Sequence, residues 1–108
     1  MPADPFQRAR IRIWIDYCNT RLQRAGGYIA HNYEVEKSSR ELRQYLVALN
    51  EQMQGREYVG DAYSLADITY LPFLFRLERY RAAVDDSLPH LNAWMRRLLN
   101  RPAVRTTA

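Results

Sequence analysis

Four side chains near the beginning of the sequence have the types and the spacing of a binding surface. They are separated by four, four and three residues, a spacing that places side chains on one side of an α-helix. They are Phe6, Arg10, Trp14 and Tyr17. Three aromatic rings and one guanidinium group on a common face can bind an apolar molecule or a carboxylate. The same face could equally pack against another domain or another subunit, and the residues by themselves leave both interpretations open.

The helix that would carry these residues is predicted to begin after Asp4 and to run to about Ala25. Asp4 is a favourable N-cap, and Pro5 and Gln7 are typical of the first and third helical positions. The pair Gly26-Gly27 is expected to end the helix. A second apolar arc lies beside the first on a helical wheel, and it consists of Ile11, Ile15, Cys18 and Leu22. The two arcs together are about twice as wide as a helix packed on one side needs, so we expect one to face the core and the other a neighbour.

A capped and strongly apolar helix is predicted to begin at about Ser64. With Ser64 as the N-cap, Asp67 is the third helical residue, and the two side chains can satisfy each other's backbone N–H groups. Asp67 could also act as a general acid or base, but the cap already explains a carboxylate here, so we interpret it as structural. The segment that follows is apolar on every side, which predicts a buried central helix. We expect it to bend at Pro72 and to end between Tyr80 and Ala83.

Two amphipathic helices complete the predicted fold. One runs from about Asn32 to Gln54, and the other begins around Ser87-Leu88-Pro89 and ends at Asn100. Each has a single apolar stripe, and no stretch shows the alternating, β-branched pattern of a strand. The sequence therefore predicts one all-α domain over residues 1–108, a bundle of four to five helices.

Composition restricts the possible partners. The 108 residues are 47% hydrophobic, as in a globular domain, and no apolar run approaches the roughly 18 residues that cross a bilayer. The net charge is +4, but the arginines are scattered and Lys37 is the sole lysine. Because a nucleic-acid tail usually concentrates its basic residues, we expect solvated helix faces and regard nucleic-acid binding as the less favoured interpretation.

The cysteine and the histidines give no sign of a reactive or metal-binding centre. Cys18 has no partner for a disulfide, which favours a reducing compartment, and its place on the core arc predicts a buried, inert thiol. His31 and His90 have no partner at metal-ligand spacing. We expect neither a metal ion nor a cofactor in this chain.

Three segments of the sequence resemble one known family. "ADPFQRARIRIWIDY" (3–17) is similar to the opening helix of the C-terminal domain of glutathione transferases. "LNEQMQGREYVGDAYSLADITYLPFLFRLERY" (49–80) resembles the central part of that domain, where a Gly-Asp turn precedes a Ser-Leu-Ala-Asp capping box. "LPHLNAWMRRLLNRPAVRTT" (88–107) is similar to its closing element. The segments cover nearly the whole chain, in the order and spacing of the family.

The resemblance implies a fold, a missing half and a function. A complete family member begins with a thioredoxin-like domain that binds glutathione and supplies the catalytic Tyr, Ser or Cys, and this chain starts where that domain would have ended. The full protein is then expected to be a cytoplasmic homodimer that joins glutathione, its co-substrate, to a small hydrophobic electrophile, or reduces through glutathione. Phe6, Arg10, Trp14 and Tyr17 would line the electrophile site, and no catalytic residue is expected in this chain. The isolated chain is therefore expected to be inactive.

The resemblance also admits a second function. Domains of this fold serve as docking modules in translation factors and in starvation-response regulators, without catalysis. A stand-alone protein-protein interaction module is therefore the alternative to half of an enzyme. The reading frame before Met1 would distinguish a fragment from a natural module.

Overall fold

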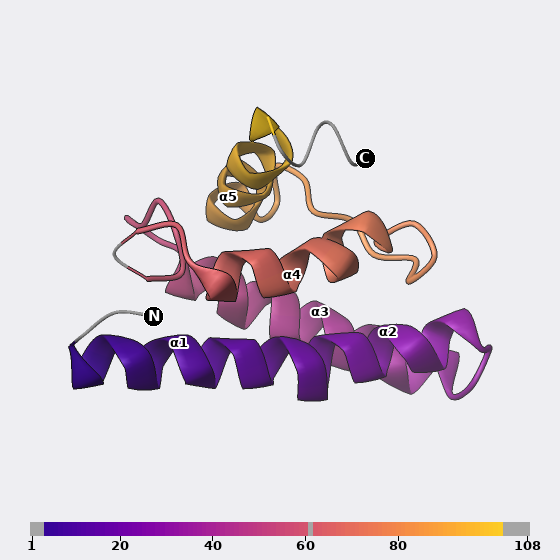
Figure 1. The fold of residues 1–108 in the computed structure, drawn as a ribbon. Coiled ribbons are helices and arrows are strands. Elements are labelled where there is room, and N and C mark those ends of the chain that lie inside the picture. Colours follow the sequence, from indigo (N-terminus) through magenta and orange to yellow (C-terminus); the bar gives the residue numbers. More distant parts are fainter. Residues whose placement is uncertain (1–3, 61, 103–108) are drawn as a thin grey trace.

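The computed structural model describes residues 4–60 and 62–102, and over these residues the regular elements are all helical (Figure 1). The elements are α1 (Pro5–Tyr17), η1 (Cys18–Leu22), α2 (Gln23–Ala30), α3 (Val35–Gln52), α4 (Leu65–Phe75) and α5 (Pro89–Leu99). Helix α1, the π-helical turn η1 and α2 follow one another without a break and form the long rod along the bottom of Figure 1. Helix α3 packs against α2 and α5, and α4 packs against α1 and α5. The prediction of an all-α bundle is confirmed.

The first helix does not end at Gly26-Gly27, as predicted, but continues to Ala30. Gly26 is a packing position, because a Cβ atom there would lie 2.4 Å from Cδ2 of the Tyr80 ring. Tyr80 is buried and donates its hydroxyl to Oε1 of Gln23 at 2.6 Å. A helical glycine costs about 1 kcal/mol relative to alanine. Here close approach of the aromatic ring outweighs that local preference.

Other boundaries also differ from the predictions, and α3 ends at Gln52 rather than Gln54. Helix α3 begins at Val35 rather than Asn32, after Glu34 with a left-handed φ of 44°. Helix α4 ends at Phe75, well before Tyr80. Pro72 has no N–H with which to continue the helical hydrogen bonds, and the chain leaves the helix within one turn of it.

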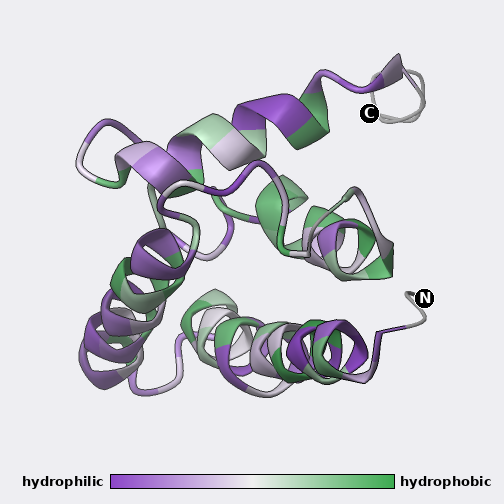
Figure 2. Ribbon diagram, turned by 90° about the vertical axis from the view of Figure 1, so that its left-hand side faces the viewer, coloured by the Kyte–Doolittle hydropathy of each residue, from purple (hydrophilic) through white to green (hydrophobic). Residues whose placement is uncertain are grey.

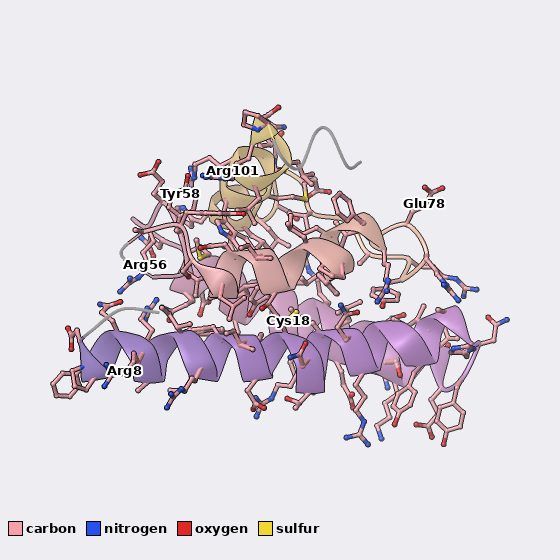
Figure 3. The ribbon with its side chains drawn as sticks, in the orientation of Figure 1. Arg8, Cys18, Arg56, Tyr58, Glu78 and Arg101 are labelled. Carbon is pink, nitrogen blue, oxygen red and sulfur yellow. The ribbon has the colours of Figure 1, made fainter. Side chains whose placement is uncertain are left out.

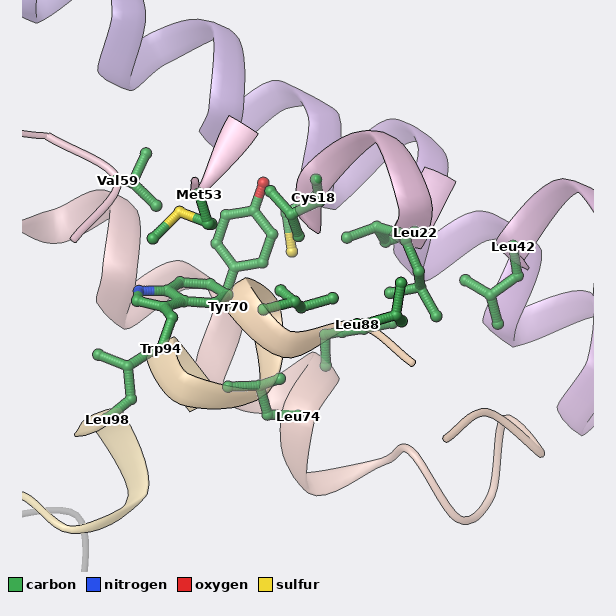
Figure 4. Packing of buried hydrophobic residues seen from close by; sticks show 14 of the residues in the cluster. Cys18, Leu22, Leu42, Met53, Val59, Tyr70, Leu74, Leu88, Trp94 and Leu98 are labelled. Carbon is green, nitrogen blue, oxygen red and sulfur yellow. The ribbon is translucent and has the colours of Figure 1, made fainter. Parts of the chain in front are cut away.

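Side chains from every helix meet in one core (Figure 4). Its centre is the edge-to-face pair of Tyr70 and Trp94, whose ring centroids are 5.1 Å apart. The Tyr70 hydroxyl donates to the Trp14 carbonyl at 2.6 Å and so joins α4 to α1. Burial raises the pKa of Tyr70. The other large buried side chains include Ile11, Leu22, Ile29, Leu49, Met53, Phe73, Leu88, Leu91 and Leu98.

Helix α4 starts after Ser64, as predicted, but it is buried on one side rather than on all sides. Ala66, Asp67, Tyr70, Phe73 and Leu74 face the core. On the opposite face Leu65, Ile68 and Phe75 are 57%, 44% and 52% exposed. Figure 2 shows the apolar character of this helix. We call these three residues the α4 stripe.

None of the described helices combines the length and apolar character that a membrane crossing requires.

Candidate functional site

The structure brings two of the four predicted site residues into one aromatic cluster. The Trp14 and Tyr17 rings meet edge to face, with centroids 4.8 Å apart, and Tyr17 meets Tyr45 of α3 in the same way at 6.0 Å. The Tyr17 hydroxyl donates to the Tyr45 carbonyl at 2.7 Å. Trp14 and Tyr17 are half-buried, so the cluster is anchored in the protein but keeps an outer surface.

The guanidinium of Arg21 lies over the ring of Tyr17, 5.5 Å from its centroid. Burial raises the pKa of Tyr17 to about 12, while the charge of Arg21 opposes that shift. The phenol is therefore neutral at physiological pH and acts as a hydrogen-bond donor rather than as a base. The cluster can stack against an apolar molecule, with one cation at its edge.

Phe6 and Arg10 stand apart from this cluster. The Phe6 side chain is 85% exposed on the first turn of α1, and Ile13 is 61% exposed. Arg10 is directed elsewhere, because its Nε donates to the Val59 carbonyl at 3.0 Å. The Gln52 amide, with its oxygen turned toward Arg10, accepts from the two terminal nitrogens of that arginine. Arg10 thus ties α1 to the segment after α3.

Arg97 of α5 and Arg101, which lies just after that helix, hold the same segment. Arg97 donates to the carbonyls of Glu57 at 2.9 Å and Arg56 at 3.1 Å. Arg101 lies 3.5 Å from the centroid of the Tyr63 ring and donates to the Tyr58 hydroxyl at 3.3 Å (Figure 3). Several arginines of this basic chain therefore hold the loop between α3 and α4 in place.

A groove of about 420 Å³ lies between η1–α2 and the first half of α3. Arg21 and Tyr45, which also contact Tyr17, are among its lining residues. The others are Thr20, Arg24, Ala25, Tyr28, Glu34, Lys37, Ser38 and Glu41. The sequence patterns did not select Tyr45, because it lies on the ordinary packing stripe of another helix. Its contact with Tyr17 depends on how the two helices meet.

Ser64 and Asp67 have the reciprocal hydrogen bonds of a capping box. Asp67 Oδ2 accepts from the Ser64 N–H at 2.9 Å, and the Ser64 hydroxyl accepts from the Ala66 N–H at 3.3 Å. The carboxylate also accepts hydrogen bonds from residues outside the cap. Its Oδ1 accepts from the Val59 N–H at 3.0 Å and from the Trp94 indole N–H at 2.9 Å. Because the fully buried Asp67 accepts from three neighbouring segments, its oxygens are committed to structure.

Nucleophile and metal chemistry find little support in the described part of the chain. Cys18 is fully buried on η1, and burial raises the pKa of its thiol to about 12 (Figure 3). A neutral thiol of this kind is a poor nucleophile. Among residues 4–60 and 62–102, no group of three His, Cys, Asp or Glu side chains is placed to hold a metal ion.

Comparison with known proteins identifies a family for most of the chain. Residues 17–102 match the family model described as "Glutathione S-transferase, C-terminal domain". The chain is 30% identical to glutathione S-transferase U27 of Arabidopsis thaliana, over 96% of its own length and 49% of that protein. It is 26% identical to glutathione S-transferase 3 of Glycine max, over 99% of its length and 52% of that protein. The chain spans about half the length of these two curated relatives.

Proposed function

Because the chain belongs to the glutathione S-transferase C-terminal domain family, we propose that it is the substrate-holding half of a two-domain glutathione transferase. A companion thioredoxin-like domain would bind glutathione and lower the pKa of its thiol. The relatives are about twice as long as this chain, which leaves room for such a domain. The helical half would hold a small hydrophobic electrophile beside the thiolate.

The observation that carries the proposal is the apolar surface that the bundle leaves uncovered. The α4 stripe exposes Leu65, Ile68 and Phe75, and α1 exposes Phe6 and Ile13. Burying a large apolar side chain is worth about 1.5 to 3 kcal/mol, so a partner that covers several of them gains substantial binding energy. We propose that the companion domain covers the α4 stripe and leaves the aromatic cluster beside the glutathione site.

In this proposal Trp14 and Tyr17 form the apolar wall of the electrophile site, and Phe6 adds a separate apolar side chain about two turns earlier on α1. Arg10 would support this wall indirectly, because its hydrogen bond to the Val59 carbonyl holds the neighbouring loop against α1. A wall of this kind accelerates a reaction by positioning the electrophile and excluding water. The thiolate sulfur would attack the electrophilic carbon as the C–S bond forms and a leaving group departs with its electron pair. The thiol proton would already have been released to solvent.

We also propose a cytoplasmic homodimer that associates through the groove between η1–α2 and α3. The groove carries Arg21, Arg24 and Lys37 together with Glu34 and Glu41. A two-fold interface brings the same patch of each subunit together, so a patch with both signs of charge can pair with its own copy. Sedimentation at several salt concentrations tests this, because interfacial ion pairs of this kind weaken with salt.

The proposed activity is tested by adding the companion domain to the chain. The chain alone should not accelerate the reaction of glutathione with a chloronitrobenzene above background. Joined to a thioredoxin-like domain of a relative, it should restore turnover, and Trp14→Ala should raise the KM for the electrophile more than the KM for glutathione. Turnover by the chain alone, or a KM effect confined to glutathione, would contradict the proposal. A fusion that binds glutathione but stays inactive would favour the docking module.

A further inference from the structure

A second cavity lies away from the aromatic cluster, where the segment between α4 and α5 passes the end of α2 (Figure 1). Its volume is about 140 Å³. A cavity of about 150 Å³ binds one benzene molecule, so this space has the size of a single aromatic ring. Its lining includes neither Trp14, Tyr17 nor Tyr45. It is therefore a separate site, sized for one aromatic ring whose polar substituent would lie at the opening.

The cavity has an apolar floor and a basic rim. Ile29, Leu42 and Leu46 form the floor, and all three are buried core residues. Arg43 of α3 and Arg81 of the 76–88 segment are exposed at the rim. An apolar floor with a few polar groups at one end is the usual composition of a small-molecule site.

The backbone of Arg81 is unfavourable for an arginine. Its φ of 52° lies in the left-handed region, which glycine adopts freely and which is sterically unfavourable for residues with a Cβ atom. The side chain is held beside the cavity by a hydrogen bond from its Nη2 to Oδ1 of Asn32 at 2.9 Å. An exposed hydrogen bond of this kind is a small gain. Strained positions of this sort concentrate at ligand sites, so a side chain kept there at a cost suggests a function.

One carboxylate also lines the cavity, and it is engaged within the protein. Asp85 Oδ1 accepts from the Ser87 N–H at 2.9 Å and the Ser87 hydroxyl at 2.7 Å. Arg43 contacts that hydroxyl from the other side, with its Nη2 3.3 Å from Ser87 Oγ. Within the described part of the chain, the ion pair closer than 4.0 Å is Lys37 with Glu34, so neither rim arginine is in contact with a carboxylate. Two guanidinium groups and one carboxylate leave the rim with a net positive charge.

We propose that this cavity binds a small monocarboxylate with a flat apolar body, of the size of benzoate. The body would rest on Ile29, Leu42 and Leu46, and the carboxylate would accept hydrogen bonds from Arg81 and Arg43. A guanidinium group fits a carboxylate with two parallel hydrogen bonds, which explains arginine rather than lysine at the rim. The site does not depend on glutathione or on a companion domain.

The test uses 4-fluorobenzoate, observed by fluorine NMR, with the full 108-residue chain. We expect saturable binding with a dissociation constant of about 1 mM or lower, which ten atoms reach at ordinary ligand efficiency. The neutral isostere 4-fluorobenzamide should bind at least about tenfold more weakly, because it lacks the charge that the arginines recognise.

Three variants locate the binding. Arg81→Gly removes the guanidinium and relieves the backbone, so the protein should stay folded while its affinity falls about tenfold. Arg43→Gln should weaken binding to a similar extent. Arg40→Gln is the matched control, because Arg40 lies one turn earlier on α3 and does not line this cavity, and it should leave the affinity unchanged.

Each other outcome overturns the proposal. Absence of saturable binding at about 10 mM probe, well above the expected dissociation constant, would exclude the site. Equal affinity for the amide would show that the charge is not recognised. Unchanged affinity in Arg81→Gly, or equal losses in Arg43→Gln and Arg40→Gln, would place the probe elsewhere on the surface.

Discussion

The indole N–H of Trp94 donates to the carboxylate of Asp67 across a distance of 2.9 Å, and both side chains are completely buried. The same carboxylate oxygen accepts from the Val59 N–H, and the other oxygen accepts from the Ser64 N–H. One aspartate therefore joins the start of α4, the loop before it and α5. A residue that in sequence only caps a helix is in space the centre of the bundle.

Removing the Asp67 carboxylate should be among the most destabilising single changes in this chain. Asp67→Ala leaves two buried N–H donors and one part-buried N–H donor without an acceptor and should lower the free energy of unfolding by about 3 to 5 kcal/mol. Ser64→Ala removes only the cap acceptor and should cost about 1 kcal/mol. Urea denaturation followed by tryptophan fluorescence measures both. Equal losses would show that Asp67 acts only as a cap.

The neighbouring glycines of the long rod should respond in opposite directions to the same substitution. Gly26→Ala forces a methyl group into the Tyr80 ring and should destabilise the fold by about 1 to 3 kcal/mol. Gly27→Ala meets no atom within 4 Å and should stabilise the helix by about 0.5 to 1 kcal/mol. Thermal unfolding of the two variants provides the measurement. A stabilised Gly26→Ala variant would contradict the close packing seen here.

The buried thiol should make the fold sensitive to alkali. Burial raises the pKa of Cys18 from 9.0 to about 12, so above pH 9 the unfolded chain loses a proton that the folded chain keeps. The unfolded state then binds fewer protons, and the free energy of unfolding falls as pH rises from about 9 toward 12. At pH 10 this group should account for a loss of about 1 kcal/mol. Denaturation of the original chain and of Cys18→Ala at pH 7 and pH 10 measures this loss. The free energy of unfolding should fall less between the two pH values in the variant, and an equal fall in both proteins would contradict this assignment.

The exposed α4 stripe should matter little to the chain alone and much to the complete protein. Ile68→Gln alters a side chain on the open face of α4, so the free energy of unfolding of the isolated chain should change by less than about 0.5 kcal/mol. In a chain joined to its companion domain, the same change should lower the unfolding temperature, because it would place a polar amide in the proposed interface. Calorimetry of both forms tests this. Arg40→Gln, on the exposed side of α3, is the control for a surface change without effect.

The sequence by itself determined the features that depend on neighbouring residues. The all-α class follows from helical periodicity and capping signals, and the start of α4 follows from Ser64 and Asp67, three residues apart. These interactions close within one turn of backbone, so their geometry is known once the local conformation is known. The resemblance to the family rested on the same short segments.

Only the tertiary structure decided the features that require distant segments to meet. Gly26 lies inside a helix because the Tyr80 ring, 54 residues later, needs the space of a side chain. Three hydrogen bonds likewise depend on how distant segments pack. They join Tyr17 to the Tyr45 carbonyl, Trp94 to Asp67, and Arg10 to the Val59 carbonyl instead of to the predicted site. Helix α4, apolar on every side in sequence, buries the face that its own bundle happens to cover. Composition determines how much apolar surface a helix has, but packing between helices determines which part of it remains for a partner.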